Sequence, residues 1–212
     1  MNPLWQWHHD PEHPYLTTSL LASWPHGFFT CQSWPTPPAV LTQQLDSAAT
    51  PYRAKQVHGQ RVMTPEQLPT ASAISDQPLP EADAVATSAA RQAAWVCTAD
   101  CTPALVADVH SGRVAAVHAG WRGTALQILP ETIRHLQTQG SQVADLRVAL
   151  GPAIAGEVYQ VTTHVALEVG RSLAPATVAD EDLLAQLQTL ADPPLLPDEA
   201  PGKVRLDVRR IN

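Results

Sequence analysis

Residues 98–123 read TADCTPALVADVHSGRVAAVHAGWRG, and this stretch decides the fold. It contains two apolar runs, residues 104–109 and residues 114–118, which are separated by a short turn sequence. Short, partly β-branched runs that are bounded by turn-forming residues are typical of strands. We therefore predict two adjacent strands whose ends bring Cys101 and His118 to one point.

The flanking sequence extends this α/β pattern on both sides. We predict further strands over residues 82–87, 94–98 and 146–150, a strand, glycine turn and strand over 52–62, a polar loop over 64–80, and helices over 39–48, 124–139, 162–173 and 181–190. Pro130 falls within the first two turns of the helix predicted after Thr124. Because proline disrupts a helix interior, that helix should begin nearer Leu129 or be kinked there.

The length of 212 residues suits a single domain over residues 1–212. Residues 174–202 are acidic and rich in proline, so we expect them to form a surface excursion rather than core. The chain stops in a segment of helical character without a glycine or proline. We expect the sequence to be truncated relative to a longer parent domain.

The charge balance narrows the range of partners. Against 13 Lys and Arg stand 20 Asp and Glu, a formal net charge of -7, and only Arg209 and Arg210 are basic neighbours. Nucleic-acid binding needs clustered basic side chains. We therefore expect a small-molecule partner and no nucleic acid.

Location is predicted from the absence of targeting signals in the sequence. No apolar run approaches the roughly 20 residues that span a bilayer, and the amino terminus lacks the pattern of a signal peptide. The three cysteines are an odd and sparse set, unlike a disulfide framework. We expect a cytoplasmic protein with reduced thiols and no membrane contact, in which Cys97 belongs to the core.

Cys101, His118 and His58 form a candidate metal site. His118 precedes the glycines of HAGWRG, and His58 lies in the glycine turn of KQVHG. Two imidazoles and a thiolate suit zinc, and three protein ligands leave one coordination position open for catalysis. The alternatives are ordinary core or hydrogen-bonded residues, or a Cys101 nucleophile with His118 as its base.

Four neighbours could complete such a site. Arg122 could bind phosphate or carboxylate through its planar fork, or form a surface ion pair. Trp121 could stack on a base or cap the core. Asp83 and Asp100 could orient metal ligands, or act as turn formers at strand ends.

The motifs taken together resemble the YfiH-like family, also called the laccase-domain or polyphenol oxidase family. The matching pieces are HGFFT (26–30), KQVHG (55–59), ADAVAT (82–87), TADCTP (98–103), HAGWRGT (118–124) and LGPAIA (150–155) before Tyr159. The family includes purine nucleoside phosphorylases and a bacterial peptidoglycan editing factor. The resemblance implies a layered α/β (α+β) sandwich with mixed sheets flanked by helices, related in fold to a toxin deamidase that uses a Cys and His pair.

The resemblance also implies a chemistry. It places zinc on His58, Cys101 and His118 and points to phosphorolysis of purine nucleosides, including methylthioadenosine, together with adenosine deamination. Purine nucleoside and phosphate would then be the partners. On this basis we predict Cys101, Asp100 and Arg122 as catalytic, and Lys55, Gln56, Asp83, Trp121 and Tyr159 as substrate-binding.

Two departures and three alternatives accompany the resemblance. The family usually reads GPCIG where residues 151–155 read GPAIA, and it continues beyond residue 212 into further elements. The alternative functions are editing of UDP-linked muropeptides, Cys–His hydrolysis, and copper-dependent phenol oxidation. Copper is less favoured because the chain lacks the several His-x-His pairs of a multicopper cluster.

Overall fold

A computed structural model describes residues 4–70, 78–175 and 177–212. Its strands are β1 (Trp5–His8), β2 (Tyr15–Thr18), β3 (Phe28–Phe29), β4 (Thr50–Arg53), β5 (Val62–Met63), β6 (Ala84–Ala86), β7 (Gln92–Trp95), β8 (Thr102–Asp108), β9 (Val114–Ala119), β10 (Leu146–Leu150), β11 (Gln160–Thr162), β12 (Leu195–Pro197) and β13 (Lys203–Leu206). Its helices are α1 (Pro38–Leu45), α2 (Trp121–Ala125), α3 (Ile128–Thr138), α4 (Thr163–Gly170), α5 (Asp180–Thr189) and α6 (Val208–Ile211).

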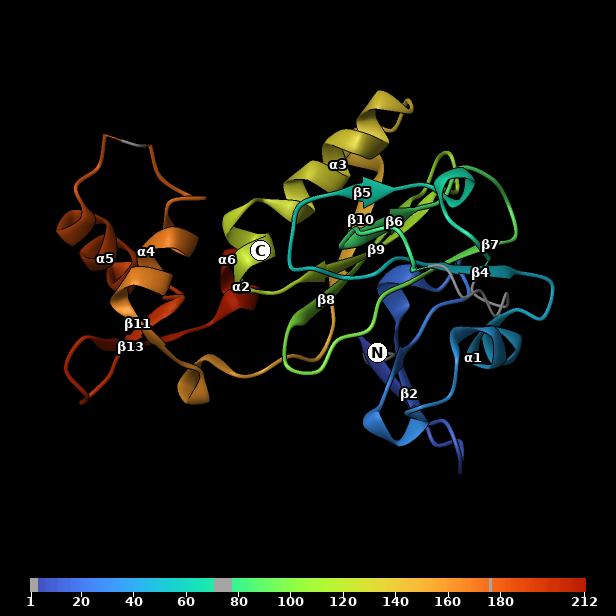
Figure 1. The fold of residues 1–212 in the computed structure, drawn as a ribbon, viewed down its shortest axis with the longest axis horizontal. Coiled ribbons are helices and arrows are strands. Elements are labelled where there is room, and N and C mark those ends of the chain that lie inside the picture. Colours follow the sequence, from blue (N-terminus) through green and yellow to red (C-terminus); the bar gives the residue numbers. More distant parts are fainter. Residues whose placement is uncertain (1–3, 71–77, 176) are drawn as a thin grey trace.

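The centre of the molecule is a five-stranded mixed sheet in the order β10-β8-β9-β6-β5. The two strands predicted from residues 98–123 form its antiparallel middle, with Pro103 opposite His118. Helix α3 lies across this sheet (Figure 1) and packs against β9, β5 and β6. The strands present mainly alanine and valine to the helix. Small side chains allow a close approach, and Ile128 and Leu136 fill the interface completely.

Two smaller sheets form a further layer beside the central one (Figure 1). One has the order β1-β2-β3, and the other is the parallel pair β4-β7, against which α1 packs. Leu21 lies in a buried cluster with Ala107 and Ala149 of the central sheet. The two layers therefore share apolar contacts.

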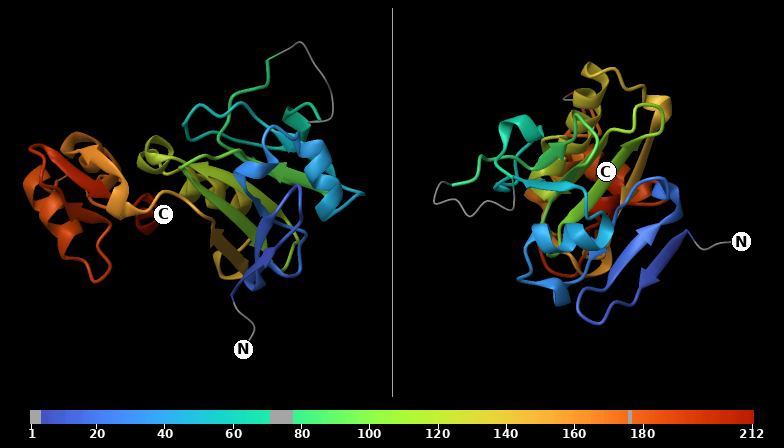
Figure 2. Two further views of the ribbon diagram at one scale, coloured as in Figure 1. Left: turned by 90° about the horizontal axis from the view of Figure 1, so that it is seen from below. Right: turned by 90° about the vertical axis from the view of Figure 1, so that its right-hand side faces the viewer.

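The carboxy-terminal segment forms its own lobe, which Figure 2 shows to one side of the central sheet. Its sheet has the order β11-β13-β12 and is covered by α4 and α5. Residues 174–202 were predicted as a surface excursion. Most of their described residues are exposed, but Leu183, Leu187 and Leu195 are buried in a second hydrophobic cluster. Three of the acidic residues lie in the first turn of α5, whereas Leu183 and Leu187, four residues apart, share the inner face of the helix.

Helix α2 connects the hydrophobic cluster between α3 and the central sheet to the second cluster, which lies in the carboxy-terminal lobe. It follows β9 directly, packs against β9, α3 and α4, and places Trp121 and Ala125 against the second cluster. The single helix predicted over 124–139 is instead two helices, because Gln127 has φ 62° and interrupts the hydrogen-bond ladder. Pro130 then falls in the first turn of α3, where its missing N–H does no harm. The expected start near Leu129 is confirmed.

Other elements agree in part with the sequence pattern. The strand predicted over 146–150 is confirmed, and α4 is capped by Thr162, whose hydroxyl accepts from the Val165 N–H at 3.3 Å. The strand predicted over 94–98 ends at Trp95, so Cys97 is exposed and its assignment to the core is wrong. Of the loop predicted over 64–80, residues 71–77 lie outside the described residues. Within the described part of the chain, no helix has the length and apolarity to cross a membrane.

The carboxylate of Asp108 stabilises the turn after β8. It is buried and caps this turn by accepting the N–H groups of His110 (2.8 Å) and Ser111 (3.0 Å). Burial raises the pKa of Asp108, but hydrogen bonds outweigh it and hold the pKa well below its usual range. Asp108→Ala should lower the free energy of unfolding at pH 7 by about 1–3 kcal/mol, because two backbone donors of the turn lose their acceptor.

Urea denaturation measures this loss, with exposed Glu199→Ala as the matched control. A group whose folded pKa is depressed stabilises above its unfolded pKa and loses that contribution as the pH falls. The difference between wild type and Asp108→Ala should therefore narrow below about pH 4. A difference independent of pH would contradict this role for the carboxylate.

Candidate metal centre

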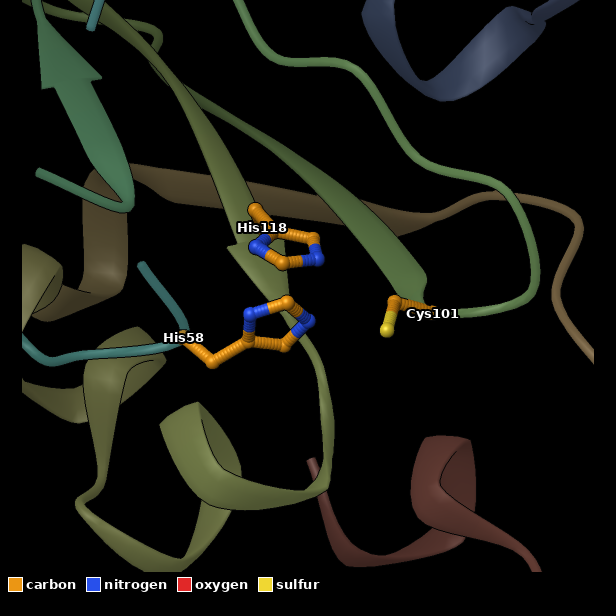
Figure 3. A group of neighbouring side chains, drawn as sticks. All are labelled: His58, Cys101 and His118. Atoms are coloured by element: carbon orange, nitrogen blue, oxygen red, sulfur yellow. The ribbon is translucent and has the colours of Figure 1, made fainter. Parts of the chain in front are cut away.

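Three side chains from separate parts of the sequence converge at one end of the central sheet (Figure 3). The ligand atoms of His58, Cys101 and His118 all lie within 4.8 Å of one another. His118 is buried in β9, Cys101 is half-buried immediately before β8, and His58 is exposed on the loop between β4 and β5. The predicted trio therefore forms a cluster that a metal ion could occupy.

The register of the central sheet explains why Cys101 and His118 meet. Because β8 and β9 are antiparallel, the start of β8 lies opposite the end of β9, with Thr102 opposite Ala119. The next residue, Gly120, lies directly against the cluster. A Cβ there would be 2.8 Å from Cys101 Sγ and 3.0 Å from His58 Cδ2. Only glycine lets the backbone pass this close to both side chains.

The carboxylate of Asp83 holds both histidines. Its Oδ1 accepts from His118 Nδ1 at 2.8 Å and from the His58 N–H at 2.9 Å, and its Oδ2 accepts from the N–H groups of Val57 (3.2 Å) and Gly59 (2.7 Å). The Asp83 carbonyl also accepts from the His118 N–H at 2.7 Å. His58 adopts φ 60°, which turns its N–H and those on either side toward one carboxylate.

The geometry favours the interpretation that Asp83 orients the metal ligands. Its side chain is completely buried and its carboxylate already accepts four hydrogen bonds, so direct contact with a substrate is disfavoured. Burial raises the pKa of Asp83, but the hydrogen bond from His118 and those from the backbone outweigh it and lower the pKa. The ionised carboxylate fixes the proton of His118 on Nδ1 and leaves Nε2 for a metal.

The charge state of His118 depends on the same neighbours. Burial lowers its pKa, but hydrogen bonds to Asp83 and to Cys101 outweigh burial and raise the pKa to about 9. Without a metal, these neighbours favour the protonated form of His118. A metal ligand must be a neutral imidazole, so metal binding would displace the proton on Nε2.

Gln56 joins the two ligand-bearing loops. Its Nε2 donates to the Cys97 carbonyl at 2.6 Å, and its Oε1 accepts from the Cys97 N–H at 2.7 Å. Gln56 is two residues before His58, and Cys97 is four residues before Cys101. Both ends of the Gln56 amide therefore bind the backbone of Cys97, and contact of Gln56 with a substrate stays a prediction.

The neighbouring Lys55 points to another partner. Its ammonium pairs with Glu81 at 2.9 Å, and both side chains are largely exposed. Contact between Lys55 and a phosphate stays a prediction, and it requires this exposed pair to open.

The remaining predicted residues line or border a small recess beside the cluster. The recess has a volume of about 20 Å³ and is lined by Asp100, Cys101, Thr102, Ala119, Gly120, Trp121, Ile154, Tyr159 and Val208. The Arg122 guanidinium stacks over the Trp121 ring at 4.2 Å. Burial raises the pKa of Tyr159, the charges of Cys101 and Asp100 add to this, and Arg122 opposes it. Asp100, Arg122 and Tyr159 are therefore electrostatic neighbours.

The sequence patterns missed Thr102, Ile154 and Val208 as neighbours of the site. Thr102 and Ile154 lie inside quoted motifs, whereas nothing in the local sequence marks Val208. A larger cavity of about 300 Å³ lies between the central sheet and the layer of β1–β4 and β7, and no predicted site residue lines it. Its apolar walls include Trp24 and Trp95.

Asp83→Asn should weaken metal binding by about 10–100-fold, because the substitution removes the charge that orients both histidines. A competitive titration with a chromophoric chelator measures the affinity for Zn²⁺, after circular dichroism has shown that the variant is folded. Asp108→Ala removes another buried, turn-capping carboxylate away from the cluster and should leave the affinity unchanged. Equal affinities of wild type and folded Asp83→Asn would refute the positioning role.

Gln56→Ala should weaken Zn²⁺ binding by about tenfold, because the loops that carry His58 and Cys101 lose their link. The same titration measures the effect. Gln92→Ala is the matched control, since the Gln92 amide accepts the N–H groups of Ser88 and Ala89 and touches neither loop. Unchanged affinity in Gln56→Ala would mean that the backbone holds the loops without the amide.

The chain is similar to proteins of known family. The model of the family described as multi-copper polyphenol oxidoreductase laccase matches residues 39–205. A protein named purine nucleoside phosphorylase slr1573 from Synechocystis sp. is 48% identical over 211 residues, which are 99% of this chain and 80% of the relative. The purine nucleoside phosphorylase Rv2149c of Mycobacterium tuberculosis is 39% identical over 118 residues, 56% of this chain and only 45% of that relative.

Solved structures share the fold. YfiH from Bacillus licheniformis superposes with a TM-score of 0.68 at 21% identity, covering 100% of this chain and 82% of that one. YlmD from Geobacillus stearothermophilus gives a TM-score of 0.60 at 25% identity, over 82% of this chain and 60% of that one. The predicted layered α/β fold and the YfiH-like resemblance are confirmed. The chain belongs to the multi-copper polyphenol oxidoreductase laccase family.

Proposed function

We propose that the protein is a metal-dependent purine nucleoside phosphorylase. The observation that carries the proposal is the cluster of His58, Cys101 and His118, in which His58 is exposed, with Tyr159 and Arg122 as electrostatic neighbours. The relative from Synechocystis, 48% identical over 99% of this chain, bears the name of that activity and supports it. Adenosine deamination and phosphorolysis of methylthioadenosine belong to the same proposal and rest on the family resemblance.

The donor set fits zinc. Two imidazoles and a thiolate are common zinc ligands, and three protein ligands leave a position for water or substrate. Bound there, zinc would lower the pKa of a coordinated water and polarise a substrate oxygen. Copper could use the same donors, but a multicopper cluster needs more histidines than this group offers. We therefore propose zinc.

Phosphorolysis assigns roles to the residues around the metal ligands. A phosphate oxygen forms a bond to C1′ of the ribose while the bond from C1′ to the purine nitrogen breaks, and the purine leaves with that electron pair and takes up a proton. Arg122 would hold the phosphate, because its planar fork suits oxyanions and the Trp121 ring orients it. Exposed Asp100 would carry the proton, since Asp83 is committed to its hydrogen bonds. Tyr159 would pack against the base.

Chromatography of adenosine or inosine incubated with phosphate and the zinc-loaded protein tests the proposal. Adenine or hypoxanthine should appear only when phosphate is present, and inosine should appear from adenosine if the deaminase activity is correct. Arg122→Ala should raise the KM for phosphate about tenfold or more, because a charge-assisted hydrogen bond is lost.

Arg134→Ala is the matched control, because Arg134 pairs with Glu131 on α3 away from the cluster. It should leave the KM unchanged. Absence of every product, with metal loading confirmed, would overturn the proposal.

A second candidate makes Cys101 a nucleophile and His118 its base. It is favoured by the closeness of the two side chains, whose reactive atoms lie within 4.8 Å of each other, and by the effect of Cys101, which helps to raise the pKa of His118 to about 9. Metal analysis separates the two. About one zinc per chain, retained through purification and lost in Cys101→Ala, favours coordination, whereas a metal-free protein alkylated at Cys101 favours covalent chemistry.

A further inference from the structure

Thr102 carries a hydroxyl for which the fold provides no partner. It is the first residue of β8, directly after the ligand Cys101, and only 1% of its surface is exposed. Its Oγ1 is buried and forms no hydrogen bond with any described group. A buried polar group without a partner costs free energy, so such a group in a native protein calls for an explanation.

The surroundings of Thr102 give that explanation. Thr102 lines the recess of about 20 Å³ that opens beside Cys101. A water-sized group needs roughly 10–15 Å³ of such space, so the recess admits one polar atom and little more. Ile154 and Val208 form apolar walls, while Asp100 and Tyr159 contribute the other polar side chains.

The acidic side chain in the recess determines which kind of polar group can bind there. Asp100 is the acidic side chain that lines the same recess. A carboxylate in this position disfavours a phosphate oxygen beside it. A neutral hydroxyl avoids this repulsion, because it can donate to the Asp100 carboxylate while it accepts from Thr102.

We infer that Thr102 is a specificity-determining residue whose hydroxyl binds a sugar hydroxyl of the substrate in this recess. The inference rests on the proposed function, since it names the part of the nucleoside that the site reads. A ligand lacking that hydroxyl leaves Thr102 buried and unpaired, which is how a polar site rejects a deoxy analogue.

The test compares wild type with Thr102→Val, which has nearly the same shape without the hydroxyl, and Thr102→Ser, which retains it. The substrates are adenosine, 2′-deoxyadenosine and 3′-deoxyadenosine, each with phosphate and zinc-loaded protein. Wild type and Thr102→Ser should prefer adenosine over one of the deoxy nucleosides by about tenfold or more in kcat/KM. Thr102→Val should lose activity on adenosine and retain it on that analogue. The ratio of kcat/KM for adenosine to kcat/KM for the analogue should therefore fall toward one.

Thermal unfolding provides a readout that separates this role from a structural one. Because Thr102→Val removes a buried hydroxyl without a partner, its Tm should equal or exceed that of wild type while its discrimination is lost. Unchanged discrimination in Thr102→Val overturns the inference, whatever its Tm.

Calorimetric binding of the same three nucleosides keeps the two proposals distinguishable. Wild type that binds adenosine more tightly than one deoxy analogue, but releases no base, contradicts the proposed phosphorolysis and supports the role of Thr102. Wild type that binds all three equally, or none, overturns the role of Thr102. The zinc affinity of Thr102→Val should stay that of wild type, since Thr102 holds none of the three ligands.

Discussion

The hydrogen bonds of the Asp83 carboxylate are the constraint on which the candidate site depends. One buried, ionised group holds the ring of His118 and the backbone of His58, which are far apart in the sequence. Without it, three backbone N–H groups and one imidazole would face each other with no acceptor. The φ of 60° at His58 persists because the carboxylate compensates for the strain of that conformation.

The fold supplies what Asp83 needs. Asp83 immediately precedes β6, and β6 pairs with β9, so its carboxylate lies at the end of β9 where His118 stands. On the other edge of β9 the antiparallel β8 brings Cys101 to the same end of the sheet. The alanine-rich strands of the central sheet pack closely against α3. Gly120 leaves space for the side chains of Cys101 and His58 to approach each other. A catalytic constellation built on packed strands is held more accurately than one on loops alone.

Much of this arrangement could be predicted from sequence, because it rests on local patterns. The apolar runs within residues 104–118 predict two adjacent strands. The glycines that follow His58 and His118 indicate that the backbone can approach a ligand closely at these two residues. The orientation of metal ligands by Asp83 was one of two predicted alternatives. Which backbone groups Asp83 and Gln56 contact could not be predicted, since it depends on which groups lie within about 3 Å after folding. The contribution of residues 174–202 to the core was not predicted, because the average composition of this segment does not reveal the spacing of Leu183 and Leu187, which face inward on α5.

Thr102 shows the same limit at the scale of one atom. Its position in the motif was visible, but the lack of a partner for its hydroxyl is a property of the packed structure. Conversely, Cys97 has an apolar sequence context and yet is exposed, because β7 ends at Trp95. The exposure of Cys97 depends on where β7 ends, and sequence patterns locate the ends of strands only to within a few residues.

The central claim is that His58, Cys101 and His118 act together as one metal site. X-ray absorption at the zinc K-edge of the zinc-loaded protein tests it directly. The zinc should have one sulfur neighbour at about 2.3 Å and two imidazole nitrogens at about 2.0–2.1 Å, with a light atom completing four-coordination. A spectrum without the sulfur shell, or with fewer than two imidazoles, would contradict it.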